Sequence, residues 1–405
     1  MKKYWKVSLV AIVILLGFGT FYIKSAMSAP EYPAFVFKNQ VGDEEEVNPL
    51  VLDGYYQEGG AMAGFSTQVQ VTSNGTDYRD NISLLDQITG YYPEKIKELQ
   101  DEYRGFMRGK GPMINSYFES DQFVAYADAT NKVGNSKSDF TINVSLLNKS
   151  DNQTKSFPIK VPDSSGIDYI DIQDVQVIDN KLYLVTDNMV ANKDEIATEN
   201  IIYTIDVASE KLIENQMIFS NLEVPQRENE DYTNVNVIQA SDDTNQHVVF
   251  LKSLQKDLPE EQRTVETVQE INVYDLVTGE MERLNIPEKL KESQVSLFDG
   301  TMLYFTSYVK QELIIMQYNI KDKEIENEFE VKLANEAEDM IYPLLSLKDE
   351  KLYVASQQIN LSTPGRIAIF DVTTGEALYT SEIVRADENE KAEQFELNLH
   401  EILIK

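Results

Sequence analysis

The residues able to do chemistry in this chain are mostly carboxylates. The 405 residues include 68 Asp and Glu, two His and no Cys. The lack of Cys excludes disulfides, thiolate metal sites and cysteine nucleophiles. His247 directly precedes an apolar run, and His400 lies on the polar side of an alternating segment, so both are expected to be surface histidines. We therefore assign no catalytic residue from the sequence.

Carboxylates alone can still support a hydrolase or a lyase, because two acids roughly 5 to 10 Å apart can share acid and base roles. The sequence does not say which acids approach each other. Calcium needs oxygen ligands at alternating positions and a glycine at the bend. The chain has three acidic runs, at 43–46, 228–231 and 387–390. They do not have this spacing and are expected to face solvent. A looser series of aspartates around Gly166 also fits poorly; it consists of Asp163, Asp168, Asp171 and Asp174. We therefore assign no metal and no cofactor.

One group of cations departs from the charge of the whole chain. The net charge of -32 repels nucleic acid, which excludes a general DNA or RNA binder. Arg104, Arg108 and Lys110 nevertheless follow one another with no acid between them. We predict that they form a docking surface for a membrane or surface protein partner. The alternative interpretation is a decorated loop without a partner.

A helix over 94–108 is expected to position these cations. Ile96, Leu99, Tyr103 and Phe106 recur at helical spacing after a proline. A lone amphipathic helix needs a surface to cover. This insertion is therefore expected to pack its apolar side on the rest of the fold.

Most of the remaining chain repeats a pair of apolar strands. One member ends in a turn of pattern D-x-x-T-G, at 85–90, 274–279 and 370–375. Weaker copies keep only the first position of the pattern, as Asn148, Asp206 and Asn319. Asp and Asn can bind the backbone two residues on, and Gly tolerates the left-handed position, so the motif predicts a hairpin turn. The other member lies upstream and contains Tyr183, Tyr304 and Tyr353 in three copies.

These strands are apolar at nearly every position, which predicts sheets buried on both faces and stacked on other sheets. The turns recur at intervals of 44 to 69 residues (319 − 275 and 275 − 206). A radial stack of four-stranded sheets at such intervals is a β-propeller. We therefore predict an all-β propeller of six blades, with seven as the alternative. Its two ends, Ala34–Phe37 and Phe395–Ile404, are expected to meet in one blade.

The pattern "L-Y-V … Y-D-x-x-T-G-E" resembles the second strand, third strand and turn of the WD-repeat and quinoprotein-like β-propellers. The resemblance covers about residues 60–383 and implies a fold, not an activity. A quinone-dependent enzyme of this type would stack its cofactor on Trp. The only Trp here is Trp5, near the N-terminus.

The N-terminal segment predicts a membrane anchor. Val7–Ile23 is a run of 17 residues without charge, and Lys2, Lys3 and Lys6 precede it. Such a run can just span a bilayer, and the lysines place the N-terminus in the cytoplasm. We thus predict a cytoplasmic tip and transmembrane helix over 1–29 and an extracytoplasmic propeller over 30–405. The alternative is a cleaved signal peptide.

Together these features predict a membrane-tethered, non-enzymatic binding or assembly module at a bacterial cell surface. The alternative function is a surface hydrolase or lyase that uses carboxylates on the top face of the propeller.

Overall fold

A computed structural model of the chain shows an all-β protein with a few short helices. None of the helices in the described part is long and apolar enough to span a membrane. The predicted anchor Val7–Ile23 lies outside that part. The structure describes residues 32–59, 66–78, 92–132, 138–192, 195–220, 232–238, 240, 244–255, 267–309, 312–332, 343–386 and 394–405.

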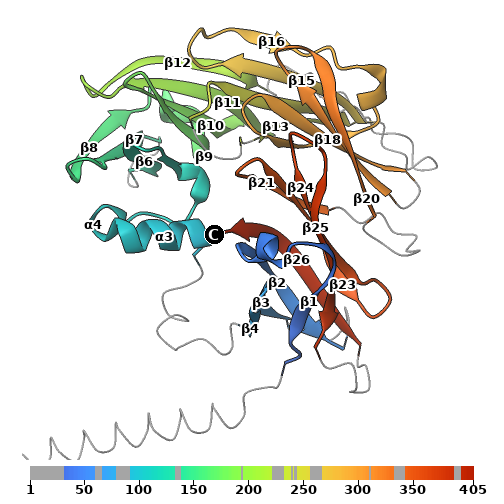
Figure 1. The fold of residues 1–405 in the computed structure, drawn as a ribbon. Helices are drawn as coiled ribbons and strands as arrows, with labels where there is room; N and C mark the ends of the chain where they lie inside the picture. Colours follow the sequence, from blue (N-terminus) through green and yellow to red (C-terminus); the bar gives the residue numbers. More distant parts are fainter. Residues whose placement is uncertain are drawn as a thin grey trace, which may run out of the picture. The chain divides into compact units, whose positions relative to one another are not determined.

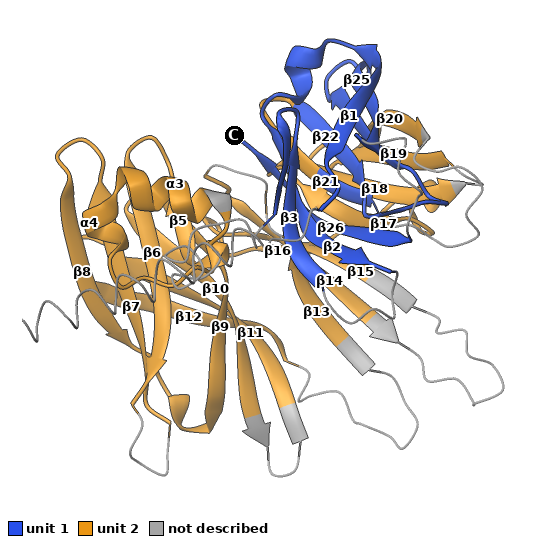
Figure 2. Cartoon of the chain, turned by 90° about the horizontal axis from the view of Figure 1, so that it is seen from below, with its two compact units in different colours: residues 1–91, 332–345, 351–405 blue, residues 92–331, 346–350 orange. Residues whose placement is uncertain are grey.

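The chain divides into two compact units (Figure 2). Unit 1 comprises residues 1–91, 332–345 and 351–405, and unit 2 comprises residues 92–331 and 346–350. The described strands form six antiparallel sheets, which we number in the chain order of their central strands. Sheets 2 to 5 belong to unit 2, and sheets 1 and 6 belong to unit 1 except for residues 346–348 at one edge of sheet 6.

Each sheet of unit 2 consists of four consecutive strands (Figure 1). Sheet 2 contains β5 (Tyr117–Glu119), β6 (Phe123–Asn131), β7 (Phe140–Asn148) and β8 (Gln153–Lys160); sheet 3 contains β9 (Ile167–Ile178), β10 (Lys181–Asn192), β11 (Glu195–Asp206) and β12 (Lys211–Ser220). Sheet 4 contains β13 (Tyr232–Ile238), β14 (His247–Gln255), β15 (Thr267–Asp275) and β16 (Met281–Arg283); sheet 5 contains β17 (Gln294–Phe298), β18 (Met302–Val309), β19 (Glu312–Asn319) and β20 (Glu324–Lys332). The 3-10 helices of this unit are η3 (Ile114–Ser116), η4 (Ser164–Gly166) and η6 (Glu288–Leu290).

Neighbouring sheets of unit 2 stack face to face. Continuous apolar clusters join sheet 2 to sheet 3, sheet 3 to sheet 4, and sheet 4 to sheet 5. The first strands of neighbouring sheets contact each other, β5 with β9 and β13 with β17. Burial on both faces explains why the strands carry so few polar residues, as predicted.

The repeated turn closes the third strand of five sheets. In each copy an Asp or Asn ends that strand, and the residue four positions later has a positive φ. The side-chain oxygen of Asp371 accepts hydrogen bonds from the backbone N–H of Thr373 and Thr374, at 2.9 and 2.8 Å. The hairpin prediction is therefore confirmed for these pairs: Asn148 and Asn152, Asp206 and Glu210, Asp275 and Gly279, Asn319 and Lys323, Asp371 and Gly375.

The upstream member of the repeat is the second strand of its sheet. Tyr183, Tyr304 and Tyr353 lie in β10, β18 and β22 (Lys351–Ser356) and are buried. The Asp179–Asn180 and Asp349–Glu350 turns before two of these strands have positive φ at both residues. This geometry suits tight hairpins, because it matches the twist of the flanking strands.

Unit 1 contains two five-stranded sheets that share one apolar cluster. Sheet 1 has the order β23-β26-β2-β3-β4 and sheet 6 the order β1-β25-β24-β22-β21. The strands are β1 (Phe35–Gly42), β2 (Leu50–Glu58), β3 (Ser66–Thr72), β4 (Gly75–Tyr78), β21 (Pro343–Lys348), β22 (Lys351–Ser356), β23 (Gln358–Asn360), β24 (Gly365–Asp371), β25 (Ala377–Arg385) and β26 (Phe395–Ile404), with the 3-10 helix η1 (Glu44–Val47).

The two ends of the chain are exchanged between these sheets. The N-terminal β1 pairs with β25 in sheet 6, and the C-terminal β26 pairs with β2 in sheet 1. The two end strands therefore do not pair in one blade, contrary to the prediction, although the rings of Phe35 and Phe395 pack 5.6 Å apart. The exchange adds a fifth strand to sheet 6, and β23 adds one to sheet 1, where four were predicted.

Sheet 1 has a hairpin turn at a place where no copy of the motif was predicted. The third and fourth strands of sheet 1 are β3 and β4, and the turn between them lies at Thr72–Gly75. The copy at 85–90 comes after both strands and lies outside the described residues.

Candidate functional site

The predicted helix is present but broken. It forms α3 (Glu94–Glu102) and α4 (Arg104–Met107), separated at Tyr103, instead of one helix over 94–108. The apolar side of both helices packs on β6 and β7 of sheet 2. The contacts join Ile96, Leu99, Phe106 and Met107 to Val124, Tyr126 and Leu147.

An ion network fixes α3 on sheet 2. Lys95 and Lys149 each place an ammonium nitrogen 2.7 Å from a different oxygen of Glu119. Burial tends to raise the pKa of Glu119, but the two lysines outweigh it and hold that pKa below its usual value. The helical segment is therefore held on the sheet by apolar packing and by charge.

The three predicted docking cations differ in their surroundings. The Lys110 ammonium donates to the carbonyl oxygen of Phe106 and lies 4.0 Å from the centre of that ring and 5.4 Å from the ring of Tyr126. Burial lowers the pKa of Lys110. Arg104 and Arg108 are exposed and form no ion pair with any described residue. Lys110 thus has structural partners, whereas the two arginines face solvent.

Exposed apolar side chains follow the arginines along the chain. Met113 and Ile114 are 70% and 45% exposed. The loop that carries them is held by Tyr126, whose hydroxyl accepts from the backbone N–H of Gly111 at 3.1 Å. We call Arg104, Arg108, Met113 and Ile114 the cationic surface.

A second polar site lies on β9 and β10 of sheet 3. Asp171 and Asp187 are direct cross-strand partners, and Asn200 is opposite Asp187 on β11. The Asn200 amide donates to a carboxylate oxygen of Asp187. Burial, together with the charge of Asp171, raises the pKa of Asp187 to about 6 despite this hydrogen bond. The exposed ring of Tyr169 lies two residues from Asp171 on the same strand.

The aspartate series around Gly166 does not assemble. Asp171 pairs with Asp187, while Asp174 pairs with Val185 and accepts from the amide of Gln176 at 3.2 Å. Burial raises the pKa of Asp174 to about 6. Within the described ranges, no group of three or more His, Cys, Asp or Glu residues could hold a metal ion.

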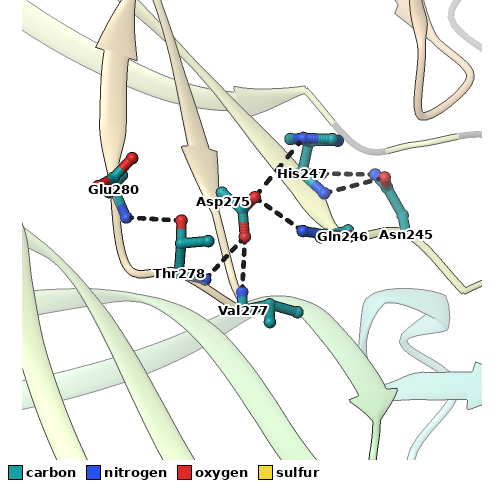
Figure 3. A network of polar contacts seen from close by, with 7 residues as sticks. All are labelled: Asn245, Gln246, His247, Asp275, Val277, Thr278 and Glu280. Atoms are coloured by element: carbon teal, nitrogen blue, oxygen red, sulfur yellow. Dashed lines mark hydrogen bonds and ion pairs between the residues drawn. The ribbon is translucent and has the colours of Figure 1, made fainter.

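His247 lies beside the turn of sheet 4 (Figure 3). Its Nε2 is 4.0 Å from a carboxylate oxygen of Asp275, and the other oxygen accepts from the backbone N–H of Val277 and Thr278 at 2.8 and 2.9 Å. Burial opposes ionisation of Asp275, but these donors and Gln246 outweigh it and lower its pKa. The carboxylate caps the turn, so the network is structural.

His400 lies at a bulge of sheet 1. The register shifts between Asp53 and Gly54 opposite Glu401 and Leu399, which leaves His400 unpaired in the ladder. Its Nε2 is 3.9 Å from the buried carboxylate of Asp53, which also accepts from the amides of Gln68 and Gln70, both at 3.1 Å. Its ring stacks on exposed Tyr55. A Cβ on Gly54 would lie 2.5 Å from the carbonyl oxygen of Asn398, so only glycine fits beside the bulge.

Sequence reasoning missed two of these arrangements. Asp187 is the only acid of its strand and lies between Thr186 and Asn188, and Asp53 precedes a glycine inside another strand. A single acid interrupting a buried strand was the available signal, because an unpaired charge is costly there. The cross-strand partners of both acids depend on register, which the sequence does not reveal.

The structure defines the class of this chain as an all-β repeat protein of six antiparallel sheets, an architecture consistent with a β-propeller. No protein-family model and no curated sequence matches it.

Solved structures with some likeness have different functions. An apocarotenoid oxygenase of Synechocystis has a TM-score of 0.45 at 8% identity, covering 88% of this chain and 94% of that one. TolB of Acinetobacter baumannii has a TM-score of 0.31 at 12% identity, and 86% and 65% are covered. A polysaccharide lyase has a TM-score of 0.36 at 11% identity, and 67% and 57% are covered. The match thus spans less than two thirds of TolB and of the lyase. With TM-scores below 0.5, these likenesses carry no argument about activity.

Proposed function

We propose that this chain is a membrane-tethered, extracytoplasmic binding or assembly module at a bacterial cell surface, built on a β-propeller related to the WD-repeat and quinoprotein-like group. The cationic surface is the observation that carries this proposal. The apolar side of α3 and α4 packs on sheet 2, whereas Arg104 and Arg108 are exposed and form no ion pair with a described residue.

Charge favours a protein partner with an acidic surface. The chain has a net charge of -32, so an acidic partner can approach only where the local charge is reversed. Met113 and Ile114, which follow the two arginines along the chain, add exposed apolar area. Interfaces combine such apolar contacts with arginine more often than the remaining surface does.

The test uses a photo-crosslinking residue at Met113, which is 70% exposed, in the full chain, in intact cells. Arg104→Glu with Arg108→Glu should reduce crosslinked protein partners at least about tenfold. The matched control is Lys132→Glu with Lys181→Glu, two exposed cations elsewhere in unit 2. Equal recovery of crosslinked partners from both variants would indicate that α3 and α4 only cover sheet 2.

The Asp171–Asp187 pair supports a second candidate function, a hydrolase or lyase acting on a glycan. One carboxyl has a pKa raised to about 6 while its cross-strand partner is exposed. Two carboxyls in different environments can divide acid and base roles. Under this proposal, Asp187→Asn would abolish release of reducing ends from bacterial wall polysaccharide, and Asp168→Asn would not. Absence of release by the wild-type chain would contradict it.

A further inference from the structure

A second exposed surface of unit 2 is the chemical complement of the cationic surface. Val277 and Met281 are 46% and 48% exposed at the hairpin that joins β15 to β16. Glu280, between them in sequence, is exposed, and so is Glu214 of β12. We call Glu214, Val277, Glu280 and Met281 the acidic surface.

Contacts between sheets 3 and 4 hold these residues together. The Tyr274 hydroxyl donates to the side-chain oxygen of Gln216 at 2.6 Å, which joins β15 to β12. Burial raises the pKa of Tyr274, and the charge of nearby Glu214 adds to the rise. Met281 is the cross-strand partner of Tyr274. The acidic surface therefore lies on the outer strands of two packed sheets.

The two surfaces match in composition. The cationic surface has two exposed arginines, the acidic surface has two exposed glutamates, and each also has two exposed large apolar side chains. They lie on different elements of one unit, the cationic surface beside sheet 2 and the acidic surface on sheets 3 and 4 (Figure 1).

We propose that the cationic surface of one copy of this chain docks on the acidic surface of a second copy. This inference rests on the proposed function, because it names the partner of the same arginines. A contact between two different surfaces is head-to-tail, so it continues from copy to copy instead of stopping at a dimer. The chain would then assemble into rows or rings on the membrane.

Electrostatics selects this arrangement over contact between two identical surfaces. Two acidic surfaces repel each other, as do two cationic ones, and copies of net charge -32 repel elsewhere. The arginines offer a local exception. Tethering in one membrane would raise the effective concentration of the copies, so a weak contact would suffice.

The absence of Cys allows a clean crosslinking test on the purified full chain reconstituted in lipid vesicles, where the copies share one membrane. Met113→Cys and Met281→Cys place one thiol on each surface. Under mild oxidation, a mixture of the two variants should give a disulfide dimer of about twice 46.2 kDa, while each variant alone gives far less. A chain carrying both substitutions should give a ladder of higher oligomers.

Charge reversal makes the test specific. Arg104→Glu with Arg108→Glu on the Met113→Cys chain should lower the mixed dimer at least about tenfold. Combining it with Glu214→Lys and Glu280→Lys on the Met281→Cys chain should restore the dimer. Lys132→Glu with Lys181→Glu should leave it unchanged, and thermal unfolding of every variant checks that the fold is kept.

Three results would overturn the inference: no mixed dimer, equal dimer from single variants, or no restoration by the double reversal. If they appear while the arginine variant still loses its crosslinked partners in cells, the docking function stands and its partner is another protein. If the arginine variant keeps those partners as well, both proposals are wrong.

Discussion

Lys110, Arg104 and Arg108 carry the same charge in the sequence but have different surroundings. We predict that Lys110→Glu lowers the free energy of unfolding by about 1–3 kcal/mol, because it places a carboxylate beside Phe106 and Tyr126. The double change Arg104→Glu and Arg108→Glu should cost about 1 kcal/mol or less in total, because both side chains are exposed. Urea unfolding of the three proteins measures the difference.

Lys110→Met is the matched control, since it keeps the length of the side chain over the two rings and removes only the charge. It should retain most of the stability. If Lys110→Glu were as stable as the arginine double variant, Lys110 would belong with the exposed cations, as first predicted.

Asp187 should make the protein less stable as pH rises from about 4 to about 6. Its folded pKa is raised from 3.8 to about 6 by burial and by Asp171. In this window the unfolded chain has already lost the proton that the folded chain keeps. The folded state therefore binds more protons, and its stability falls with rising pH.

Asp187→Asn removes this contribution, so its unfolding free energy should decline less between pH 4 and 6. Asp168→Asn, an exposed position on the neighbouring strand β9, should follow the wild type. Denaturant titrations at pH 4, 5, 6 and 7 test this. Parallel curves for wild type and Asp187→Asn would show that the carboxyl titrates normally.

Only part of the candidate sites could be predicted from the sequence. The cluster Arg104, Arg108 and Lys110 is visible because charge is local information. The burial of Lys110 is not, because it depends on Tyr126 of a strand that follows 16 residues later. The Asp171–Asp187 pair depends on the register of two strands, which a bulge shifts between Val185 and Thr186.

The turns at the end of the third strands test the repeat at the level of the element. We predict that Gly279→Val or Gly375→Val costs about 1–3 kcal/mol, since each glycine has a φ of 73° and a β-branched residue resists that conformation. The unfolding temperature should fall in each case.

Lys323→Gly is the matched control, because Lys323 occupies the equivalent position with a φ of 59°. Relief of the left-handed strain, about 1–2 kcal/mol, is partly offset by the larger entropy that glycine loses on folding. This variant should therefore change stability by about 1 kcal/mol or less. Loss of stability as large as in Gly279→Val would contradict the equivalence of the turns.

The second strands should be sensitive to loss of their tyrosines. Tyr304 is fully buried, and its hydroxyl contacts Asp299 at 3.1 Å and the amide of Gln317 at 3.0 Å. We predict that Tyr304→Ala costs about 3–5 kcal/mol. Tyr304→Phe isolates the hydroxyl and should cost about 1–3 kcal/mol, because it leaves polar partners unpaired. A wild-type melting temperature for Tyr304→Ala would contradict its place in the core.

Sequence periodicity predicted elements whose information is local. The spacing of Asp or Asn to a left-handed residue identified the third strand of five sheets, and the apolar runs identified the second strands. The strand pairing of sheets 1 and 6 was harder to predict, because these sheets pair Phe35 with Arg385 and Leu50 with Ile404. No local pattern encodes pairing between residues about 350 positions apart. The break at Tyr103 was also missed, since Ile96, Leu99 and Phe106 keep their helical spacing across it.

At the scale of the whole molecule, the proposed topology predicts a protease result. Protease added to intact wall-less cells should remove nearly the whole chain and leave a short N-terminal fragment containing Val7–Ile23 in the membrane. The physical reason is the uncharged run of 17 residues after three lysines. Survival of the full-length chain would contradict the orientation. Release of soluble protein that begins near Ala29 would indicate a cleaved signal.

The exchange of the two ends determines when the molecule can finish folding. Each sheet of unit 2 is made of consecutive strands, so it can form as soon as its own residues have been synthesised. Strand β1 has to wait for β25, about 350 residues later. At about 5–20 residues per second, this delay is on the order of 20–70 s.

During the delay, Phe35, Leu50 and Leu52 lack the sheets that later bury them. A newly made chain is therefore most vulnerable to proteases and aggregation at β1 and β2, which are made long before their partner strands. Any cleavage or premature stop that removes the last ten residues, Glu396–Lys405, would leave this end permanently exposed. Strand β26 therefore completes the burial of residues that were made about 350 positions earlier.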